Sequence, residues 1–322
     1  MDTGSHLLFG ATLAGLGFMS PEVASDPHLA AAVLTVTLVG SHAPDLDSVV
    51  RFKSQDSYLK HHRGTSHSIP AWFIWAGLIG SLASWAWGVG DQLLLLTLFA
   101  FAAVALHVFF DWTNAYGVQC LLPFRKEWLH LDILCLTDPF LVVVHVSAVA
   151  FGIFGGQRYA LWACAIAWGT TLFYIAWRFL HHGVVLRRVR RRYRRWRAVH
   201  VLPGLWWFRW QYVVQTDDGF EMGFIEGRRW LPTKRLPLIS PHVCIEATRH
   251  VSSVRTLHGF AKREYVSWTR EPDGGYLVIW TDLRFWRAKD WPYRAEVKLD
   301  DQLNVVNERI GWYKKTWEAP YV

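Results

Sequence analysis

The chain has 322 residues, of which 52% are hydrophobic and 19% are charged, and its formal net charge is +8. This length is enough for about two domains at the usual ~100–200 residues each. The four cysteines are scattered without a CxxC pair, which argues against a cysteine zinc site and against a disulfide framework.

One short run accounts for the net charge. Eight arginines lie between Arg187 and Arg197, and without them 26 basic side chains balance 26 acidic ones. A run of this kind could bind nucleic acid. Because it directly follows an apolar segment, we instead interpret it as a cytoplasmic stop signal that faces anionic lipid. Nucleic acid is therefore not an expected partner.

The first half of the chain is dominated by apolar segments. Two near the N-terminus are shorter than the ~20 residues that a full span needs, so crossing and re-entrant arrangements both stay open for them. Two longer pairs follow, each joined by a short turn, and the segments are 7–19, 29–40, Ile69–Gly88, Leu93–Phe110, Pro139–Gly155 and Tyr159–Leu180. With about six apolar helices, the basic residues between the segments lie on one side, apart from Arg158. The positive-inside rule makes that side the cytoplasm and places both termini there.

The composition changes after Arg197. Runs of aromatic and β-branched residues predict strands at Trp206–Gln215, Phe220–Ile225, Tyr265–Thr269, Tyr276–Asp282 and Arg294–Leu299. The expected fold is an all-α polytopic membrane domain followed by a small, mostly antiparallel β domain. We expect the helical domain over residues 1–183, an arginine-rich cytoplasmic linker over 184–199 and the β-rich domain over 200–322.

Polar side chains gather at the ends of the first four apolar segments. They are His6 before the first, Asp45 and Asp47 after the second, His62, Arg63 and His67 before the third, and His107 and Asp111 near the end of the fourth. If the chain crosses the membrane as predicted, most of these ends lie on the cytoplasmic side. Four helix ends could then converge on one site.

Histidine and aspartate in this arrangement are typical metal ligands. His107 and Asp111 are four residues apart, so they share one helix face and could chelate one ion. An ionisable residue within a span is costly and usually faces a partner or a cavity. Alternatively, Asp111 only hydrogen-bonds to His107. The Asp45/Asp47 pair has the DxD spacing of many metal sites, although this spacing is also common in loops.

The order of these motifs also resembles that of a known protein family. Ser5-His6, Pro44-Asp45-Leu46-Asp47, the stretch His62–Ser68 and the stretch His107–Asp111 stand in the order found in a bacterial family of membrane-bound, metal-dependent hydrolases. That family is also described as LexA-binding, inner-membrane-associated hydrolases. The resemblance covers residues 1 to 180. The chain departs from the family pattern at Ser5 and Ser66, where threonine is expected, but a hydroxyl is kept at both positions.

The resemblance implies a hydrolase of the bacterial inner membrane, multi-pass, with its C-terminal domain in the cytoplasm. The family is distantly similar to all-helical zinc-dependent phospholipases C, which implies a phosphoester or lipid-linked substrate such as a phospholipid. The expected metal ligands are His6, Asp45, His67, His107 and Asp111. Zinc is the first expectation, because mixed imidazole–carboxylate ligation suits it, with manganese or iron as alternatives.

We expect the remaining polar residues to act on a metal-activated water or to bind the substrate. Asp47 or His62 would act as a base or would orient a ligand. Arg63 would hold a phosphate group together with the backbone of Gly64, Thr65 and Ser66.

Two other classes of function stay open. The same residues could form a structural metal cluster or a hydrogen-bonded cluster in a membrane scaffold whose β domain recruits a cytoplasmic protein partner. An ion transporter is the third reading, since ionisable residues in spans also mark ion paths. The clustering of the candidates at one membrane face argues against transport. In every reading the membrane lipids are partners of the helical half.

Overall fold

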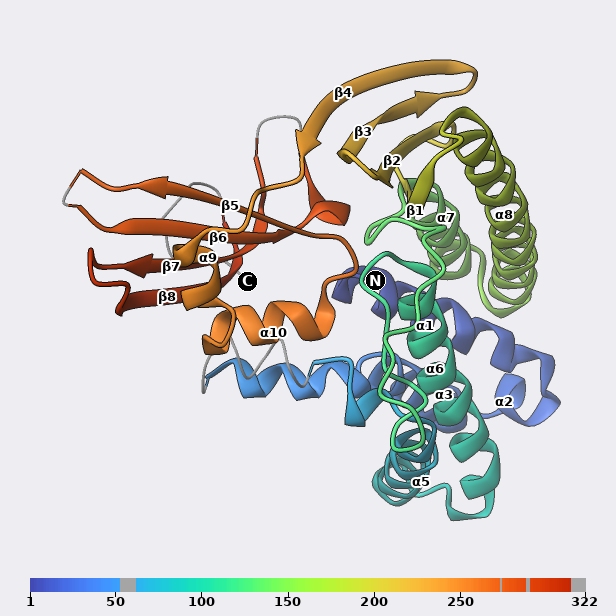
Figure 1. Ribbon diagram of the computed structural model, residues 1–322. Coiled ribbons are helices and arrows are strands. Elements are labelled where there is room, and N and C mark those ends of the chain that lie inside the picture. Colours follow the sequence, from blue (N-terminus) through green and yellow to red (C-terminus); the bar gives the residue numbers. More distant parts are fainter. Residues whose placement is uncertain (53–61, 273, 288–289, 314–322) are drawn as a thin grey trace. The chain divides into compact units, whose positions relative to one another are not determined.

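The computed structural model describes residues 1–52, 62–272, 274–287 and 290–313. The chain forms two compact units. The first comprises Met1–Asp47 and Arg63–Val184, and the second comprises Ser48–His62 and Val185–Val322. Helix α8 runs through the boundary at Val184 (Figure 1).

The first unit is helical. Its helices are α1 (Thr3–Leu16), α2 (Pro21–Ser25), α3 (Pro27–Gly40), α5 (Ile69–Ala86), α6 (Leu93–Thr113), α7 (Pro139–Gly155) and most of α8 (Gln157–Arg192). Short 3₁₀ segments, η2 (Ala43–Phe52) and η3 (Thr65–His67), follow α3 and precede α5. The helix starts follow from local sequence. Asp2 caps α1, and Asp138 caps α7 ahead of a proline in its first turn.

Fewer of these helices are long enough to span a membrane than the sequence suggested. Among the described residues, three qualify: Ile69–Ala86, Gly90–Thr113 and Gln157–Arg192. A fourth is possible if α3 and Ala43–Val49, which meet at 46°, form one broken span. Helices α1 and α7 have 14 and 17 residues. At ~1.5 Å per residue both fall short of a ~30 Å hydrocarbon core. The helical membrane half is confirmed, whereas the count of about six becomes three or four.

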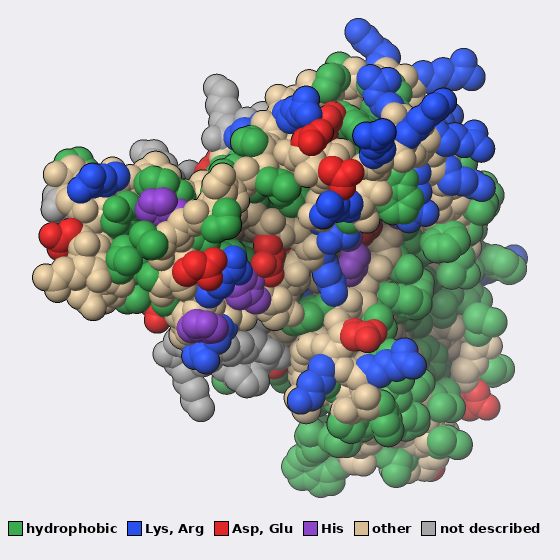
Figure 2. All heavy atoms as spheres, viewed as in Figure 1, with side chains coloured by type: hydrophobic (Ala, Val, Ile, Leu, Met, Phe, Trp, Pro, Cys, Tyr) green, Lys and Arg blue, Asp and Glu red, His purple; other side chains and the backbone are tan. Residues whose placement is uncertain are grey.

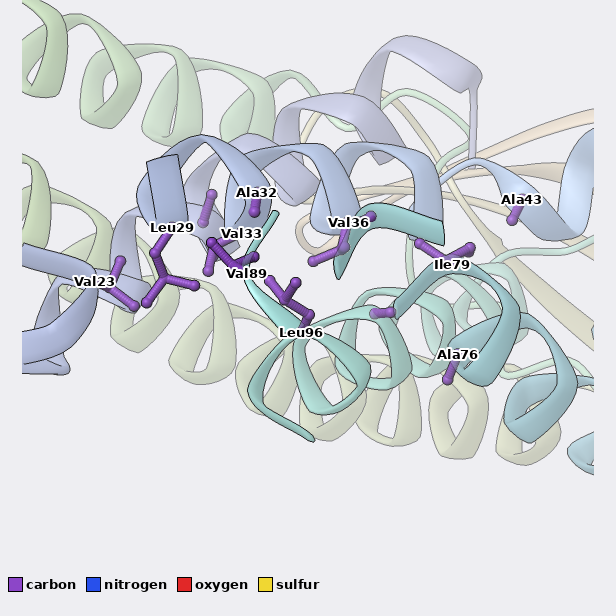
Figure 3. Close-up of a cluster of buried hydrophobic side chains, with 13 residues drawn as sticks. Val23, Leu29, Ala32, Val33, Val36, Ala43, Ala76, Ile79, Val89 and Leu96 are labelled. Atoms are coloured by element: carbon purple, nitrogen blue, oxygen red, sulfur yellow. The ribbon is translucent and has the colours of Figure 1, made fainter. Parts of the chain in front are cut away.

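The spans pack through small residues. Helices α5 and α6 form a hairpin that α3 joins, and their side chains meet in one buried apolar cluster (Figure 3). At Gly40 of α3, an added Cβ would lie 3.0 Å from both the carbonyl oxygen of Ala100 and the Cβ of Ala103. The glycine therefore lets α3 approach α6 closely, as is common between membrane helices.

The second unit holds two four-stranded antiparallel sheets, in the orders β1-β2-β3-β4 and β5-β6-β7-β8 (Figure 1). The strands of the first sheet are β1 (Trp196–Pro203), β2 (Arg209–Thr216), β3 (Gly219–Glu226) and β4 (Arg229–Pro237). Those of the second are β5 (Glu264–Arg270), β6 (Tyr276–Asp282), β7 (Tyr293–Leu299) and β8 (Val305–Trp312). Helices α9 (Val243–Thr248) and α10 (Ser252–Phe260) lie between the sheets in the sequence. The antiparallel β architecture expected after the helices is confirmed.

Three strands escaped the sequence analysis, and each has a physical reason. Strand β4 contains Pro232 and Pro237, which are tolerated because β4 is a sheet edge. Strand β1 begins inside the arginine-rich run, and the first half of β8 is exposed. Conversely, the predicted strand at Trp206 begins only at Arg209, and the aromatic residues before it form a turn.

The arginine-rich segment, expected as a linker over 184–199, is helical up to Arg192. Val185 and Val189 of α8 are buried together with Val201, Trp210 and Tyr212 of the first sheet. The part of α8 after Val184 therefore packs into the core of the second unit.

Candidate metal centre

The candidate site lies within the first unit, where several chain segments end. The residues involved are His6 in α1, Asp45 in η2, His67 in η3, and His107 and Asp111 in α6. None of these residues is more than 8% exposed. Their placement at segment ends brings together positions that are up to a hundred residues apart in the sequence.

Four of the five converge on one point. Asp45, His67, His107 and Asp111 each offer one ligand atom, and these atoms all lie within 4.8 Å of one another. The Nε2 atom of His67 is 3.5 Å from Oδ1 of Asp45 and 3.5 Å from Oδ2 of Asp111. The Nε2 atom of His107 is 3.5 Å and 3.6 Å from the same two oxygens. Two imidazole nitrogens and two carboxylate oxygens are the number and type of donors found in tetrahedral zinc sites.

Both imidazole rings are held with Nε2 facing this point. Nδ1 of His107 lies 2.7 Å from the carbonyl oxygen of Ser41. A carbonyl oxygen only accepts, so Nδ1 carries the proton and Nε2 of the neutral ring keeps its lone pair. Nδ1 of His67 is 2.9 Å from Oγ of Ser66 and 3.5 Å from Oδ2 of Asp47. Such contacts behind the ligating atom fix ring orientation in metal sites.

The environment of Asp111 is the observation that best fits a cation at this point. Its side chain is fully buried, and Oδ2 has no hydrogen-bond donor among the described residues. Burying a carboxylate oxygen without a partner is costly. Oδ1 is engaged separately, by the guanidinium of Arg63 at 3.0 Å and by the amino group of Met1. The residues present therefore fit a divalent metal bound through Oδ2.

His67 is the residue whose charge partly balances the buried carboxylates when no metal is bound. Burial by itself lowers the pKa of His67, but the neighbouring carboxylates of Asp111, Asp45 and Asp47 outweigh it and raise the pKa to about 10. In the metal-free form His67 thus carries a proton at neutral pH. This positive charge partly offsets the buried carboxylates, which a metal ion would otherwise do.

His6 lies beside this four-residue group. Its Nε2 is 3.4 Å from Oδ1 of Asp111 and 3.0 Å from the amino nitrogen of Met1. Its ring stacks on that of His107, with the centroids 3.8 Å apart. His6 thus contacts Oδ1 of Asp111, whereas His67 and His107 lie near Oδ2, and the role of His6 as a ligand remains a prediction.

Arg63 points inward. The residue is buried, and its guanidinium contacts Asp111, the Oδ1 atom of Asn114 at 3.3 Å and the ring of Tyr116 at 5.4 Å. Its backbone has a φ of 63°, in the left-handed region. The sequence analysis predicted that Arg63 binds a phosphate group. In the structure, Arg63 also neutralises the buried carboxylate of Asp111.

The predicted phosphate loop is tied to the DxD pair. Asp47 accepts hydrogen bonds from the backbone N–H of Arg63 at 3.1 Å and from Oγ of Ser66 at 2.5 Å. Gly64 precedes η3, and Thr65 is exposed. Asp47 thus orders the loop and also lies behind His67. His62 is half-buried and is assigned to the second unit, so its catalytic role remains a prediction.

Two contributors were not foreseen from the sequence. Ser41 acts through its backbone carbonyl, which leaves no side-chain signal. Asn114 accepts from Arg63 and from the backbone N–H groups of Tyr116 and Gly117, so it shapes the turn after α6. Its spacing of three residues from Asp111 was the available hint.

Comparison with known proteins gives matches over both halves of the chain. Residues 1–184 match the family described as "YdjM inner membrane protein", and residues 243–318 match the "YfhP C-terminal alpha/beta plait domain". The "Uncharacterized protein YfhP" of Bacillus subtilis (strain 168) is 30% identical over 321 residues, covering 97% of this chain and 95% of the relative. No solved structure matches. The segment between the two matched regions carries the first β sheet.

Proposed function

The chain belongs to the YdjM inner membrane protein family, and on this premise we propose that it is a membrane-embedded, metal-dependent hydrolase acting on a phosphoester or lipid-linked substrate. The observation that supports this most is the convergence of two Nε2 atoms and two carboxylate oxygens on one buried point. Buried ionisable residues at the ends of membrane helices are costly, so they point to function.

In the proposed centre, four residues would bind the metal ion and a fifth would accept a proton. Asp45, His67, His107 and Asp111 would hold the ion, with zinc as the first candidate and manganese or iron as alternatives. A divalent ion there supplies Lewis acidity and makes water a nucleophile near neutral pH. Asp47, which is half-buried and orders the loop, is positioned to accept a proton at the edge of the group.

The loop before α5 suits an anionic substrate. Residues Gly64–Ser66 lie just ahead of a helix that begins at Ile69, where free N–H groups and the helix dipole favour negative charge. Apolar side chains of α5 such as Phe73 and Ile74 are 64% and 68% exposed and suit contact with lipid tails. A substrate with a phosphoester head and an apolar tail would match both features.

We further propose that the second unit lies on the cytoplasmic side of the inner membrane. The arginines at the end of α8 support this orientation through the positive-inside rule.

A structural metal is the second candidate, and one observation favours it. His67, His107 and Asp111 are at most 1% exposed, which is typical of a closed structural site. In a structural site the ion would be bound, but no substrate would be turned over.

Metal analysis of detergent-purified protein tests the proposal. Wild type would be compared with His107→Ala and Asp111→Asn, and with His28→Ala as a surface control on α3. We expect about one ion per chain in wild type and control and loss from both site variants. Absence of metal from every sample after incubation with zinc or manganese would contradict the proposal. Metal without hydrolysis of any phosphoester or phospholipid offered would favour the structural reading.

A further inference from the structure

The turn between β1 and β2 exposes four consecutive apolar side chains. Leu205 is 64% exposed, Trp206 74%, Trp207 44% and Phe208 56%. Single exposed apolar residues are ordinary, whereas a contiguous group of large ones marks an interaction surface. The group lies at the tip of a hairpin, and Trp210, two residues after Phe208, is fully buried. The hairpin is therefore anchored firmly at its base.

Basic side chains surround this turn. The N–H of Gly227, in the β3–β4 turn, donates a 2.9 Å hydrogen bond to the carbonyl oxygen of Phe208. The next residues, Arg228 and Arg229, are both exposed. Arg188 of α8 donates a 3.2 Å hydrogen bond to the carbonyl oxygen of Gly227. The apolar tip and three arginines thus share one end of the first sheet.

The acidic residues nearest in sequence to these two turns are paired elsewhere or lie at the other end of the sheet. Glu226, the acidic residue closest in sequence to the β3–β4 turn, pairs with Arg209 at 3.3 Å. Asp217 and Asp218 lie between β2 and β3, at the opposite end of the strands. Figure 2 shows Lys and Arg side chains gathered around the end of α8.

The chain path brings this end of the first sheet beside the start of the second unit's part of α8. The apolar stretch of α8 reaches Leu180, and Arg188 follows eight residues later, a rise of about 12 Å. After α8 ends at Arg192 the chain reverses, and β1 runs back so that Val201 packs with Val185 and Val189. The β1–β2 turn follows at the end of this returning strand. It therefore lies beside the segment of α8 from Val185 to Arg188.

We propose that the turn Leu205–Phe208 inserts into the interface of a bilayer containing anionic phospholipid. Tryptophan favours the headgroup level, because its apolar ring can contact lipid there while its N–H remains solvated. Arg188, Arg228 and Arg229 bind the phosphates around it, because basic side chains are attracted to an anionic lipid surface. This assignment is independent of the proposed hydrolase activity.

A fluorescent reporter in the full-length protein tests the insertion. An environment-sensitive fluorescent amino acid is incorporated in place of Trp206, or in place of Asp218 as the control at the other end of the sheet. Each protein is reconstituted into nanodiscs of phosphatidylcholine, with or without phosphatidylglycerol, and quenched by lipid carrying a spin label near the headgroup. Iodide serves as the aqueous quencher.

We expect the reporter at position 206 to be quenched several-fold more strongly by the spin-labelled lipid than the reporter at 218, with the opposite order for iodide. Replacing both arginines, Arg228→Ser with Arg229→Ser, should abolish the extra quenching that phosphatidylglycerol gives. Iodide quenching at 206 equal to that at 218 would overturn the proposal. Protection of position 206 from both quenchers would mean that protein covers the turn, which also overturns it. Equal lipid quenching in the two lipid mixtures would overturn the requirement for anionic lipid.

Discussion

Nδ1 of His107 donates a 2.7 Å hydrogen bond to the backbone carbonyl of Ser41, and this bond joins the candidate metal centre to the end of α3. His107 lies near the end of a 21-residue helix, whereas Ser41 is the residue at which α3 stops. The position of the α3 terminus therefore sets which nitrogen of His107 faces the other donors. Packing around Ser41 should accordingly affect metal binding without any change to a ligand.

Gly10 of α1 tests this coupling. A Cβ at Gly10 would lie 2.7 Å from the carbonyl oxygen of Thr37 and 3.0 Å from Cβ of Ser41, so Gly10→Val must displace the end of α3. Overpacking of this kind costs about 1–3 kcal/mol. We expect Gly10→Val to lower the metal content and the Tm together. Gly77→Val, on α5, is the matched control, since nothing lies within 4 Å of its Cβ position. Full metal content in Gly10→Val would show that Ser41 does not orient the ligand.

Asp111 and Arg63 offer a second test, through a double-mutant cycle. Asp111→Asn leaves the buried guanidinium of Arg63 without its carboxylate, which costs about 3–5 kcal/mol in such pairs. We expect loss of both metal and thermal stability. Adding Arg63→Met should restore much of the stability but none of the metal, because it removes the uncompensated charge. Recovery of metal in the double variant would exclude Asp111 as a ligand.

The sequence was most informative where chemistry and periodicity coincide. His107 and Asp111 share one helix face, so their spacing alone brought them together. The DxD pair and His67 were placed by their position at the ends of apolar segments. The sheets were predicted where aromatic and β-branched residues cluster, as in Tyr276–Asp282, which matches β6 residue for residue.

What escaped prediction depends on tertiary contacts. The carbonyl of Ser41 acts through the backbone, and a backbone group carries no sequence signal. Arg63 was predicted to hold a phosphate group, whereas in the structure its guanidinium pairs with the buried carboxylate of Asp111, from a backbone position with a left-handed φ. The aromatic run at Trp206 resembles a strand because tryptophan and phenylalanine favour strands, whereas here the three aromatic residues form an exposed turn.

His145 provides a contrast to the candidate ligands. It is fully buried in α7, with Nδ1 2.7 Å from Oγ1 of Thr12 and Nε2 2.8 Å from Oγ1 of Thr171. Both ring nitrogens are thus engaged by hydroxyl groups. We expect His145→Leu to cost about 1–3 kcal/mol, since two buried hydroxyls lose a partner, while the metal content stays at the wild-type level. Thermal unfolding and metal analysis on the same preparation would show this, and loss of metal with an unchanged Tm would contradict it.

Cys135 gives a prediction on thiol reactivity. Burial and then the nearby carboxylate of Asp138 raise the pKa of this thiol to about 12, against the opposing effect of Arg178. A raised pKa means that the neutral thiol persists at pH 8, where the thiolate fraction is about one in ten thousand. Iodoacetamide should therefore leave Cys135 unmodified in the native protein, and its reaction rate should rise with each further unit of pH. Mass spectrometry of tryptic peptides measures this directly, with urea-unfolded protein as the control in which all four cysteines react. Modification of Cys135 at pH 8 as fast as in the unfolded chain would show that the thiol is not held neutral.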